Sequence, residues 1–369
     1  MYLHQLRLTN YKNYSSVRLD FQHDFVIFTG QNGAGKTNLL DAIYQLSFCK
    51  SNFQHRDALL VKTGEDLFRI EGQYKHEGEQ YKTVIKYSSS SKKVTEFDGK
   101  SIGKMSDHVG RIPLVFIGPR DIQLFFDGSD ERRRFMDSGI CQLDKTYLQN
   151  LLIYNRVLAQ RNSYLKSLPA HQIDTDLLNS YDKQLVTPAH QIFEKRKIFI
   201  ERFSILFTDV YKHISGDQEV VSCDYKSQLL DNELTTLLIE NRKKDLILQR
   251  TTQGIHKDDI VLKMKGLALK QFGSEGQLKT FLLSMKLAMW HVIKNETTLS
   301  PILLLDDIFA KLDSNRVKNL LNYIQQYCKT QILITDTDQE RVSDILTAIE
   351  FNHEVYHIDN NSINQIHEA

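Results

Sequence analysis

Hydrophobic and polar residues alternate along the N-terminal part of the chain in the manner of β-strands. The alternation is clear over residues 17–22, and it returns at residues 68–70 and 81–87 on either side of a turn at residues 76–79. Strands with one apolar and one polar face are typical of an antiparallel sheet that is buried on one side only. The pattern therefore predicts a β-rich lobe in this part of the chain.

The spacing of apolar residues changes from about residue 130 onward. Apolar residues then recur at every third and fourth position over residues 148–158 and 185–210, which is typical of the buried stripe of a long helix. We expect two antiparallel helices that are joined at residues 167–171. Pro188 either starts the second helix or kinks it.

Strand patterns return after these helices, at residues 219–223 and 259–264, and apolar runs continue into the C-terminal third. A chain of 369 residues is longer than one ordinary domain, so a domain with an insertion is expected. The predicted division is an N-terminal head part at 1–128, a helical arm at 129–216 and a C-terminal head part at 217–369.

The chain carries a complete phosphate-binding motif, G-x-x-x-x-G-K-[ST], in the run Gly30-Gln31-Asn32-Gly33-Ala34-Gly35-Lys36-Thr37. An apolar run at 24–29 precedes it and a helical pattern at 38–46 follows, so the motif joins a strand to a helix. Glycines let the backbone turn its N–H groups toward phosphates at the positive end of that helix. We predict that this run binds ATP, that Lys36 reaches the β- and γ-phosphates and acts in catalysis, and that the Thr37 hydroxyl sits on Mg²⁺. The alternative is a glycine-rich turn that only caps a helix, and it does not require the complete motif.

An acidic pair follows a strand that is predicted to be fully buried. The apolar run 301–305 suits a central parallel strand, and Asp306 and Asp307 come at its carboxyl end, where such sheets bind ligands. We predict that Asp306 holds Mg²⁺ through its water shell and that Asp307 is the catalytic residue that orients or deprotonates the attacking water. The alternative is a buried strand that ends in a solvated acidic turn. It is disfavoured because the phosphate motif requires an acidic partner.

A further motif, Ser274-Glu275-Gly276-Gln277, precedes a helix with apolar residues from 278 to 292. Ser274 and Gln277 also fit a capping box, so the motif alone favours neither interpretation. Beside the other motifs it resembles the signature motif of ABC-type ATPases, whose serine hydroxyl, glycine amide and helix N-terminus face the γ-phosphate of ATP on the opposite protomer.

The segment 310–313 follows the acidic pair and matches the place of the so-called D-loop, so Asp313 would reach across the interface of a dimer. An isolated aspartate is, however, most often a turn or cap residue. The resemblance to ABC-type ATPases implies a two-fold homodimer with two ATP molecules at its interface. The residues expected to contact ATP in trans are Ser274, Gly276, Gln277 and Asp313.

The formal net charge of +1 gives the chain no overall attraction for nucleic acid, so any contact with DNA must come from a local patch. Candidate patches are Arg132-Arg133-Arg134 and Lys195-Arg196-Lys197, with a further one at residues 242–244. Most basic triplets are instead solvated helix faces or ion-paired. No helix-turn-helix or zinc module is visible, so binding would be directed to DNA structure rather than to sequence.

The cysteines and the apolar segments indicate the compartment. The four cysteines lack metal-like spacing, and no segment resembles a secretion signal or approaches the ~20 apolar residues of a membrane span. The expectation is a soluble cytoplasmic protein with reduced thiols and no membrane partner.

With these motifs in place, the chain closely resembles the RecF family of bacterial recombination and replication repair proteins, which are related to the SMC heads. The resemblance runs nearly end to end and rests on the segments 6–14, 38–44, 132–137, 154–162 and 303–313. It implies an α/β fold, namely an ABC-type, SMC-head-like P-loop ATPase domain with an antiparallel β lobe and an inserted α-helical arm.

The resemblance also implies a function. A RecF-type protein is expected to form an ATP-driven dimer that binds duplex DNA, single strands and gap junctions, with weak, DNA-stimulated hydrolysis of ATP used as a binding switch. It is expected to serve recombinational repair and replication-fork maintenance, and to help load RecA together with RecO and RecR.

Two segments depart from the patterns of these families. Segment 251–259 carries Ile255 and Lys257 where the RecF family usually has Pro and Arg. Pro119-Arg120-Asp121 stands where ABC-type ATPases keep their Q-loop, and Gln123 is displaced. We assign no role to either segment.

Two other functions fit the ATPase motifs. An SMC-like or transporter-type ATPase acting on a protein cargo is disfavoured by the short arm, and by Thr335-Asp336-Thr337-Asp338 where transporter ATPases place a switch histidine. A structural protein that binds phosphate without hydrolysing ATP is disfavoured by Asp306 and Asp307.

Overall fold

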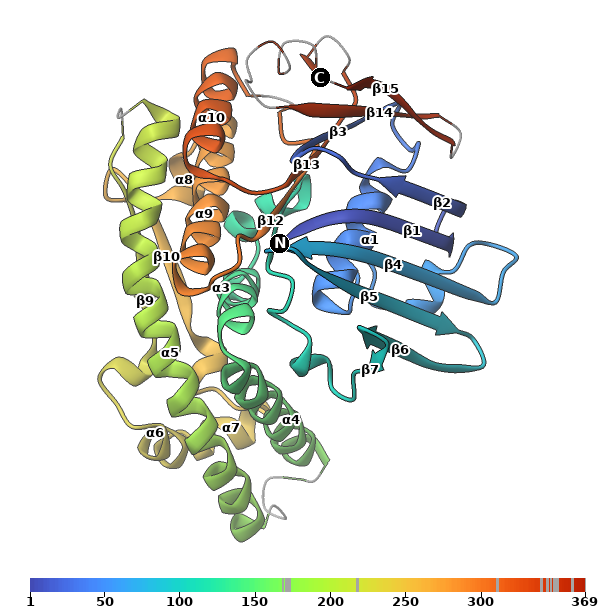
Figure 1. Cartoon of the computed structure of the whole chain (residues 1–369). Helices are drawn as coiled ribbons and strands as arrows, with labels where there is room; N and C mark the ends of the chain where they lie inside the picture. Colours follow the sequence, from blue (N-terminus) through green and yellow to red (C-terminus); the bar gives the residue numbers. More distant parts are fainter. Residues whose placement is uncertain are drawn as a thin grey trace. The chain divides into compact units, whose positions relative to one another are not determined.

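The computed structural model describes residues 1–167, 169, 174–216, 219–309, 312–338, 341–342, 345, 347, 352–359 and 362–368 (Figure 1). The chain forms two compact units. The first unit comprises Met1–Asp121, Asp209–Gln218 and Ser274–Ala369, and the second comprises Ile122–Thr208 and Glu219–Gly273. Each unit is therefore assembled from segments that are far apart in the sequence.

A six-stranded sheet of order β15-β14-β3-β13-β12-β8 forms the core of the first unit. All neighbours pair in parallel except β15, which is antiparallel to β14. Every residue of β3, β12 and β13 is buried, and this explains their unbroken apolar runs, because both faces of the sheet are covered. The strands are β3 (Phe25–Thr29), β8 (Leu114–Ile117), β12 (Ile302–Asp306), β13 (Ile332–Asp336), β14 (His353–Asp359) and β15 (Ser362–Glu368).

The predicted antiparallel β lobe is confirmed as a second six-stranded sheet of order β2-β1-β4-β5-β6-β7. It lies against helix α1 (Lys36–Phe48) so closely that a Cβ at Gly72 would lie 2.6 Å from Leu46 Cδ1. The strands are β1 (Tyr2–Tyr11), β2 (Tyr14–Asp20), β4 (Leu67–His76), β5 (Glu79–Ser88), β6 (Ser91–Phe97) and β7 (Lys100–Ser101).

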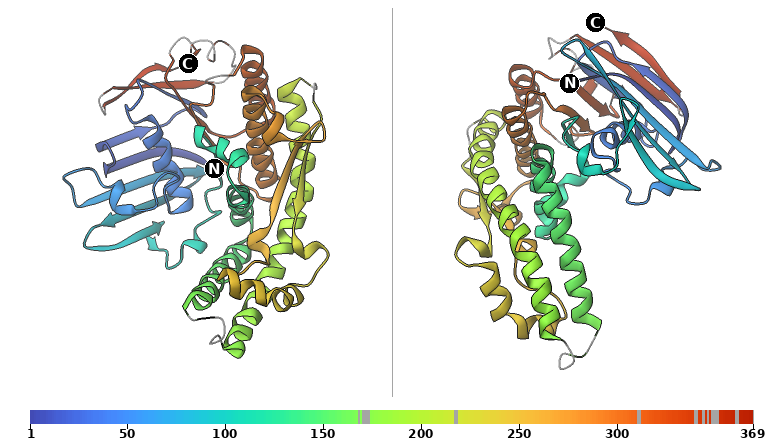
Figure 2. Two further views of the ribbon diagram at one scale, coloured as in Figure 1. Left: turned by 180° about the vertical axis from the view of Figure 1, so that it is seen from behind. Right: turned by 60° about the horizontal axis from the view of Figure 1, so that its bottom comes forward.

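Helices α9 (Glu275–Glu296) and α10 (Ser314–Tyr327) lie side by side in the first unit (Figures 1 and 2). The last turns of α5 (Thr175–Ser215) pack against them, with Tyr211 contacting Phe281 edge to face at 5.8 Å between ring centroids. Asn319 Nδ2 also donates to Ile214 O at 3.2 Å. Short 3₁₀ turns complete this unit at η1 (Asp57–Leu60) and η2 (Met105–Asp107), and η3 (Pro119–Ile122) ends where the second unit begins.

The second unit is mainly helical. Its helices are α2 (Gln123–Phe126), α3 (Ser129–Leu143), α4 (Lys145–Ser167), most of α5, α6 (Leu234–Glu240), α7 (Arg242–Leu248) and α8 (Leu269–Phe272). Its strands β9 (Val221–Lys226), β10 (Asp259–Met264) and β11 (Leu267–Ala268) form an antiparallel sheet of order β11-β10-β9, and 3₁₀ turns lie at η5 (Gln228–Leu230) and η6 (Ile255–Lys257).

The predicted pair of long helices corresponds to α4 and α5, which lie side by side, with Asn150 Nδ2 donating to Gln191 Oε1 at 2.6 Å (Figure 2). Pro188 lies inside α5 and does not start it. Of the predicted connection, residues 168 and 170–171 lie outside the described residues.

The compact units group Glu219–Gly273 with the helical segment, whereas the predicted division placed these residues in the head. Ion pairs also join these residues to the helical segment within the second unit. Arg132 of α3 forms an ion pair with Asp259 of β10, and Arg196 of α5 forms one with Asp258.

Candidate functional site

The predicted phosphate loop connects β3 to α1. Three of its glycines have positive φ angles, 142° at Gly30, 82° at Gly33 and 113° at Gly35, in a region that residues with a side chain rarely adopt. A Cβ at Gly30 would lie 2.3 Å from the carbonyl oxygen of Ile358, and one at Gly35 would lie 2.4 Å from Asn13 Nδ2. Gly30 is therefore required by its conformation and by the neighbouring backbone, whereas Gly35 is required mainly by its conformation.

The side chain of Lys36 folds back over this loop. Its Nζ donates to Gly30 O at 2.6 Å and to Gln31 O at 2.8 Å. Burial lowers the pKa of Lys36, and nearby carboxylates, Asp307 first among them, oppose the shift. The ammonium group thus binds the loop backbone and is within electrostatic influence of the acidic residues predicted to act with it.

The structure brings together Thr37 and Asp306, which are 269 residues apart. Thr37 Oγ1 donates to Asp306 Oδ1 at 2.8 Å, with Oδ2 at 3.1 Å. Asp306 pairs with Thr335 across β12 and β13, and Thr335 Oγ1 donates to Asp306 Oδ1 at 2.7 Å. Burial raises the pKa of Asp306, while the hydrogen bonds from Thr335 and Thr37 act against the shift. A hydroxyl beside a carboxylate is the oxygen donor set that Mg²⁺ prefers, so these residues fit that ion.

Asp307 follows β12 in a left-handed conformation with φ of 48°. Its backbone N–H lies 3.1 Å from both Thr335 O and Thr335 Oγ1. Among the described residues, the buried Oδ1 of Asp307 has no hydrogen-bond partner. Burial raises the pKa of this carboxyl group, and the negative charges of Asp336 and Asp306 raise it further. The Oδ1 atom of Asp307 can therefore accept a hydrogen bond from a ligand or a water molecule.

The signature-like motif lies at the start of α9. Ser274 is the N-cap residue, its Oγ accepts a hydrogen bond from Gln277 N at 3.3 Å, and Ser274 N donates to Gln277 Oε1 at 2.8 Å. The capping box is therefore present. Ser274 is nevertheless exposed, so its hydroxyl can meet a second molecule, and the role of the motif in trans stays a prediction.

Asp313 is exposed and caps α10, because its Oδ1 accepts a hydrogen bond from Arg316 N at 2.9 Å. Residues 310 and 311 of the predicted D-loop lie outside the described residues. The role of Asp313 across a dimer also stays a prediction.

Two residues near the site, Asn13 and Asp121, make contacts that the sequence did not predict. Asn13 Nδ2 donates to Ala34 O at 3.3 Å, and Asn13 Oδ1 accepts from Asn38 Nδ2 at 2.6 Å, so Asn13 joins the loop to α1. Its position in the first family segment hinted at importance without naming this contact.

The second of these residues is Asp121, which lies in a segment that was given no role in the sequence analysis. Lys286 of α9 donates to Asp121 Oδ1 and to Phe116 O, each at 2.8 Å. Asp121 Oδ2 accepts from Gly118 N at 2.8 Å. Asp121 therefore ties the middle of α9 to the end of β8. Lys286 is 165 residues away in sequence, so no local pattern could have predicted the pair.

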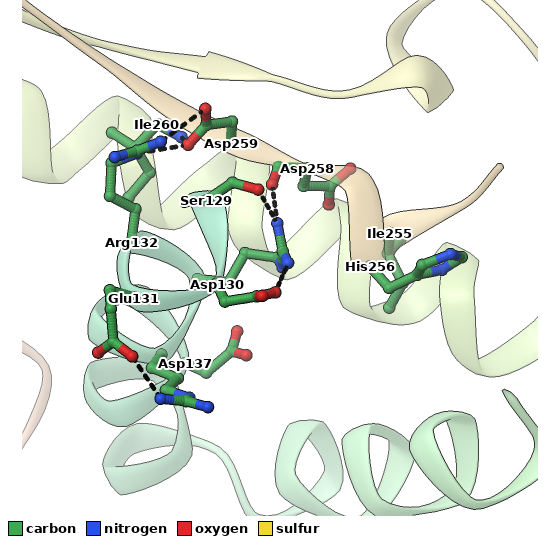
Figure 3. A network of polar contacts seen from close by, with 12 residues as sticks. Ser129, Asp130, Glu131, Arg132, Asp137, Ile255, His256, Asp258, Asp259 and Ile260 are labelled. Carbon is green, nitrogen blue, oxygen red and sulfur yellow. Dashed lines mark hydrogen bonds and ion pairs between the residues drawn. The ribbon is translucent and has the colours of Figure 1, made fainter. Parts of the chain in front are cut away.

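The first basic cluster is largely occupied by contacts within the second unit (Figure 3). Arg132 pairs with Asp259 at 2.6 Å and donates to Leu124 O at 3.0 Å. Arg133 donates to Asp258 O at 2.6 Å and pairs with Asp130. The side chain of Arg134 pairs with Glu131 and is still 71% exposed. Arg132 and Arg133 are thus engaged in contacts within the protein, as expected for most basic triplets. Arg134 is the residue of this cluster that a ligand could reach.

The second basic cluster divides in the same way. Lys195 pairs with Asp144 at 2.8 Å and keeps 54% of its side chain exposed, and Lys197 is exposed. Arg196 does not fit the predicted contact with DNA. Its side chain is only 2% exposed and forms ion pairs with Asp137 at 3.0 Å and with Asp258 at 2.7 Å. A guanidinium that is enclosed in this way cannot track a DNA backbone.

The segment that departs from the family pattern takes part in the same buried network. Arg196 Nη1 donates to Ile255 O at 2.8 Å, and the Ile255 side chain is buried. Lys257 ends the same 3₁₀ turn. Segment 251–259 therefore includes a structural support for α5.

Other kinds of site are not found in the described part of the chain. It contains no group of three or more His, Cys, Asp or Glu residues placed to hold a metal ion. No helix in it has the length and apolar character needed to cross a bilayer. All four cysteines lie in this part of the chain, are buried, and form no disulfide bond with one another.

The arrangement of strands, phosphate loop and acidic pair, with an antiparallel lobe on the same unit, is that of the P-loop ATPase heads of ABC and SMC proteins. Residues 2–362 match the model of the RecF/RecN/SMC N-terminal domain family. The SMC head of Pyrococcus furiosus, solved with the C-terminal domain of ScpA, is 15% identical with a TM-score of 0.58 and covers 99% of this chain and 96% of its own, so it supports the fold alone.

Nearer relatives define the family. The DNA replication and repair protein RecF of Flavobacterium johnsoniae is 42% identical over 361 residues, which are 98% of this chain and 100% of the relative. RecF of Parabacteroides distasonis is 38% identical and covers 100% of both chains. A structure of the recombination mediator protein RecF with ATP, in the RecFOR pathway, has a TM-score of 0.87 at 27% identity and covers 99% of this chain and 98% of its own. The chain belongs to the RecF family.

Proposed function

We propose that this chain is an ATP-dependent DNA-binding protein of recombinational repair and replication-fork maintenance. In this proposal ATP drives two copies together, and the dimer holds DNA at gaps and at junctions of single and double strands. Slow hydrolysis of ATP then lets the two copies separate. The proposal also includes that the protein helps load RecA together with RecO and RecR. Family membership supports the general activity, and the residues of the site support the mechanism.

The observation that carries the proposal is the contact of Thr37 with Asp306 beneath a lysine-bearing glycine loop. Gly30–Thr37 would hold the phosphates of ATP, with Lys36 at the β- and γ-phosphates. Thr37 and Asp306 would hold Mg²⁺, whose role is to neutralise the developing phosphate charge. The donor types present at these positions match both ligands.

Asp307 is the proposed general base. A buried carboxylate oxygen without a partner among the described residues can accept a proton from water or orient it. The pKa of Asp307 is raised toward the range in which a carboxylate becomes a more effective base. Lys36 would stabilise the charge that develops on the transferred group.

The second half of each ATP site is proposed to come from the partner protomer. The exposed Ser274, together with Gly276, Gln277 and Asp313, would meet the ATP held by the other copy. Such a composite site makes ATP part of the dimer interface, so nucleotide binding and DNA retention become linked.

DNA contacts are proposed for the exposed cations Arg134, Lys195 and Lys197. Contacts of this type reach phosphates rather than base edges, so binding would depend on salt and would not be sequence-specific. Arg132 and Arg133 would support this surface by fixing α3.

The proposal is tested by fluorescence anisotropy of a labelled gapped duplex, titrated with the protein with Mg-ATP and without nucleotide, at two salt concentrations. ATP-dependent, salt-sensitive binding is expected. Lys36→Ala should abolish the ATP effect, while Lys50→Ala, at an exposed lysine just after α1, should not. Retained ATP affinity in Lys36→Ala would contradict the assignment of the phosphate loop. Intact ATP-driven dimers that bind no DNA in either state would favour a protein cargo instead.

A further inference from the structure

The two segments expected to reach the partner's ATP are joined by one side chain within the first unit. Arg316 lies in the first turn of α10, three residues after Asp313, and its guanidinium contacts α9. Arg316 Nη1 donates to Thr280 Oγ1 at 3.0 Å, and Thr280 Oγ1 in turn donates to Gly276 O at 3.0 Å. A chain of polar contacts therefore runs from α10 to the signature-like motif.

The other end of the guanidinium holds the predicted D-loop residue. Arg316 Nε lies 3.1 Å from Asp313 Oδ2, while Asp313 Oδ1 accepts from the Arg316 backbone N–H at 2.9 Å. Asp313 is thereby fixed twice by the same residue. The side chain of Arg316 is only 25% exposed, whereas that of Asp313 is 58% exposed, so the guanidinium is the better shielded partner of this pair.

Gly276 allows this approach. A Cβ at position 276 would lie 2.9 Å from Arg316 Nη1, so any larger residue would force the guanidinium to move. The glycine predicted to offer its amide in trans is therefore also the residue against which Arg316 packs. Forty residues separate the two positions, so this relation belongs to the folded chain and not to a local motif.

We infer that Arg316 is a positioning residue that holds the Ser274–Gln277 segment and Asp313 at a fixed spacing, so that both meet the ATP of a second copy of this chain together. This inference rests on the proposed composite site and adds a residue that touches neither the nucleotide nor the reacting atoms. Arg316 acts through Thr280 and Asp313. Loss of the link leaves each segment intact and lets the two move independently.

The test compares Arg316→Met, which keeps the length of the side chain and removes its donors, with Lys318→Met on an exposed lysine of the same helix. ATP binding by the monomer is measured by titration with a fluorescent ATP analogue, and ATP-dependent dimerisation by sedimentation velocity. Arg316→Met should leave monomer ATP affinity within about twofold and weaken dimerisation at least about tenfold, the factor expected for losing one charge-assisted hydrogen bond from an oriented segment. Lys318→Met should change neither quantity.

Thr280→Val provides a second variant that preserves volume and breaks the same chain of contacts. It should weaken dimerisation in the same direction, and the double variant should be no weaker than Arg316→Met alone, because both act through one link. Additive losses would overturn the inference, as would wild-type dimer affinity in Arg316→Met. If the wild-type protein itself stays monomeric with ATP, the proposed composite site fails first, and that result is distinct from failure at Arg316 alone. Thermal unfolding of each variant separates loss of folding from loss of dimerisation.

Discussion

The Thr37 hydroxyl lies 2.8 Å from Asp306 Oδ1, and so joins the first turn of α1 to the end of β12. Thr335 donates to the same oxygen at 2.7 Å from the neighbouring strand β13. The two threonines thus make the same kind of contact with one carboxylate. Only Thr37 belongs to the phosphate loop. Variants of the two residues can therefore separate support of Asp306, which both provide, from a direct role at the nucleotide.

Thr37→Val should weaken ATP binding in the presence of Mg²⁺ at least about tenfold, and it should change binding in EDTA much less, because it removes a proposed ligand of the ion. Thr335→Val removes a hydrogen bond to Asp306 without removing a proposed ligand, so its Mg²⁺ dependence should match the wild type. Isothermal titration calorimetry with and without Mg²⁺ measures both. Equal effects of the two variants would mean that Thr37 acts only by supporting Asp306.

Ser274→Arg should leave ATP binding by the monomer unchanged and prevent the ATP-dependent dimer. A bulky cation at the exposed start of α9 would block the approach of a second copy, while the phosphate loop is made by other residues. Sedimentation velocity with ATP measures the outcome. Dimers that persist in this variant would show that the motif is only a helix cap.

Asp307→Asn should slow ATP turnover by at least about 100-fold and lengthen the lifetime of the ATP-bound dimer, because the amide cannot take a proton from water. ATP affinity should be retained. Single-turnover hydrolysis measures the rate, and dissociation after dilution measures the lifetime. Asp24→Asn, at an exposed aspartate just before β3, is the control, and an unchanged rate in Asp307→Asn would remove Asp307 from the mechanism.

Arg196→Met should lower the free energy of unfolding by about 3–5 kcal/mol, because it leaves the carboxylates of Asp137 and Asp258 without their buried partner. The adjacent Lys197→Met should change stability by less than about 0.5 kcal/mol and reduce the salt dependence of DNA binding. Urea unfolding and anisotropy at several salt concentrations measure the two effects. Equal stability of the two variants would contradict the assignment of Arg196 as an enclosed structural residue.

His256 should make the second unit sensitive to acid. Its Nε2 lies 3.0 Å from Thr251 O, which can only accept, so Nε2 carries the proton and Nδ1 accepts from the Tyr154 hydroxyl at 2.7 Å. Burial lowers the pKa of His256 to about 4. As pH falls from about 6.5 toward about 4, the unfolded chain gains a proton that the folded chain resists, so the free energy of unfolding should fall by up to about 1.4 kcal/mol per pH unit.

His256→Gln can make both hydrogen bonds without titrating, so its stability should depend less on pH over that range. Urea unfolding of the two proteins at a series of pH values gives the comparison. Parallel pH profiles would mean that His256 contributes nothing to the acid sensitivity.

Those parts of the fold that depend on local spacing could be predicted from the amino-acid sequence. The glycine loop between a strand and a helix, the buried strand that ends in Asp306, and the alternation of the β lobe all follow from backbone conformation and from which faces are buried. These constraints act within one element, so a linear pattern records them. The capping box of Ser274 and Gln277 is local in the same sense and was predicted as an alternative.

Which charged residues pair with one another over long sequence distances became clear only in the folded chain. Three basic residues in a row give the same linear pattern whether they face solvent or carboxylates, and the folded chain encloses Arg196 while it exposes Lys197. The pairs Lys286–Asp121 and Arg316–Thr280 likewise join elements that no sequence period relates. Burial and ion pairing depend on neighbours that sheet order and helix packing bring together, and the pattern along the chain does not contain those neighbours.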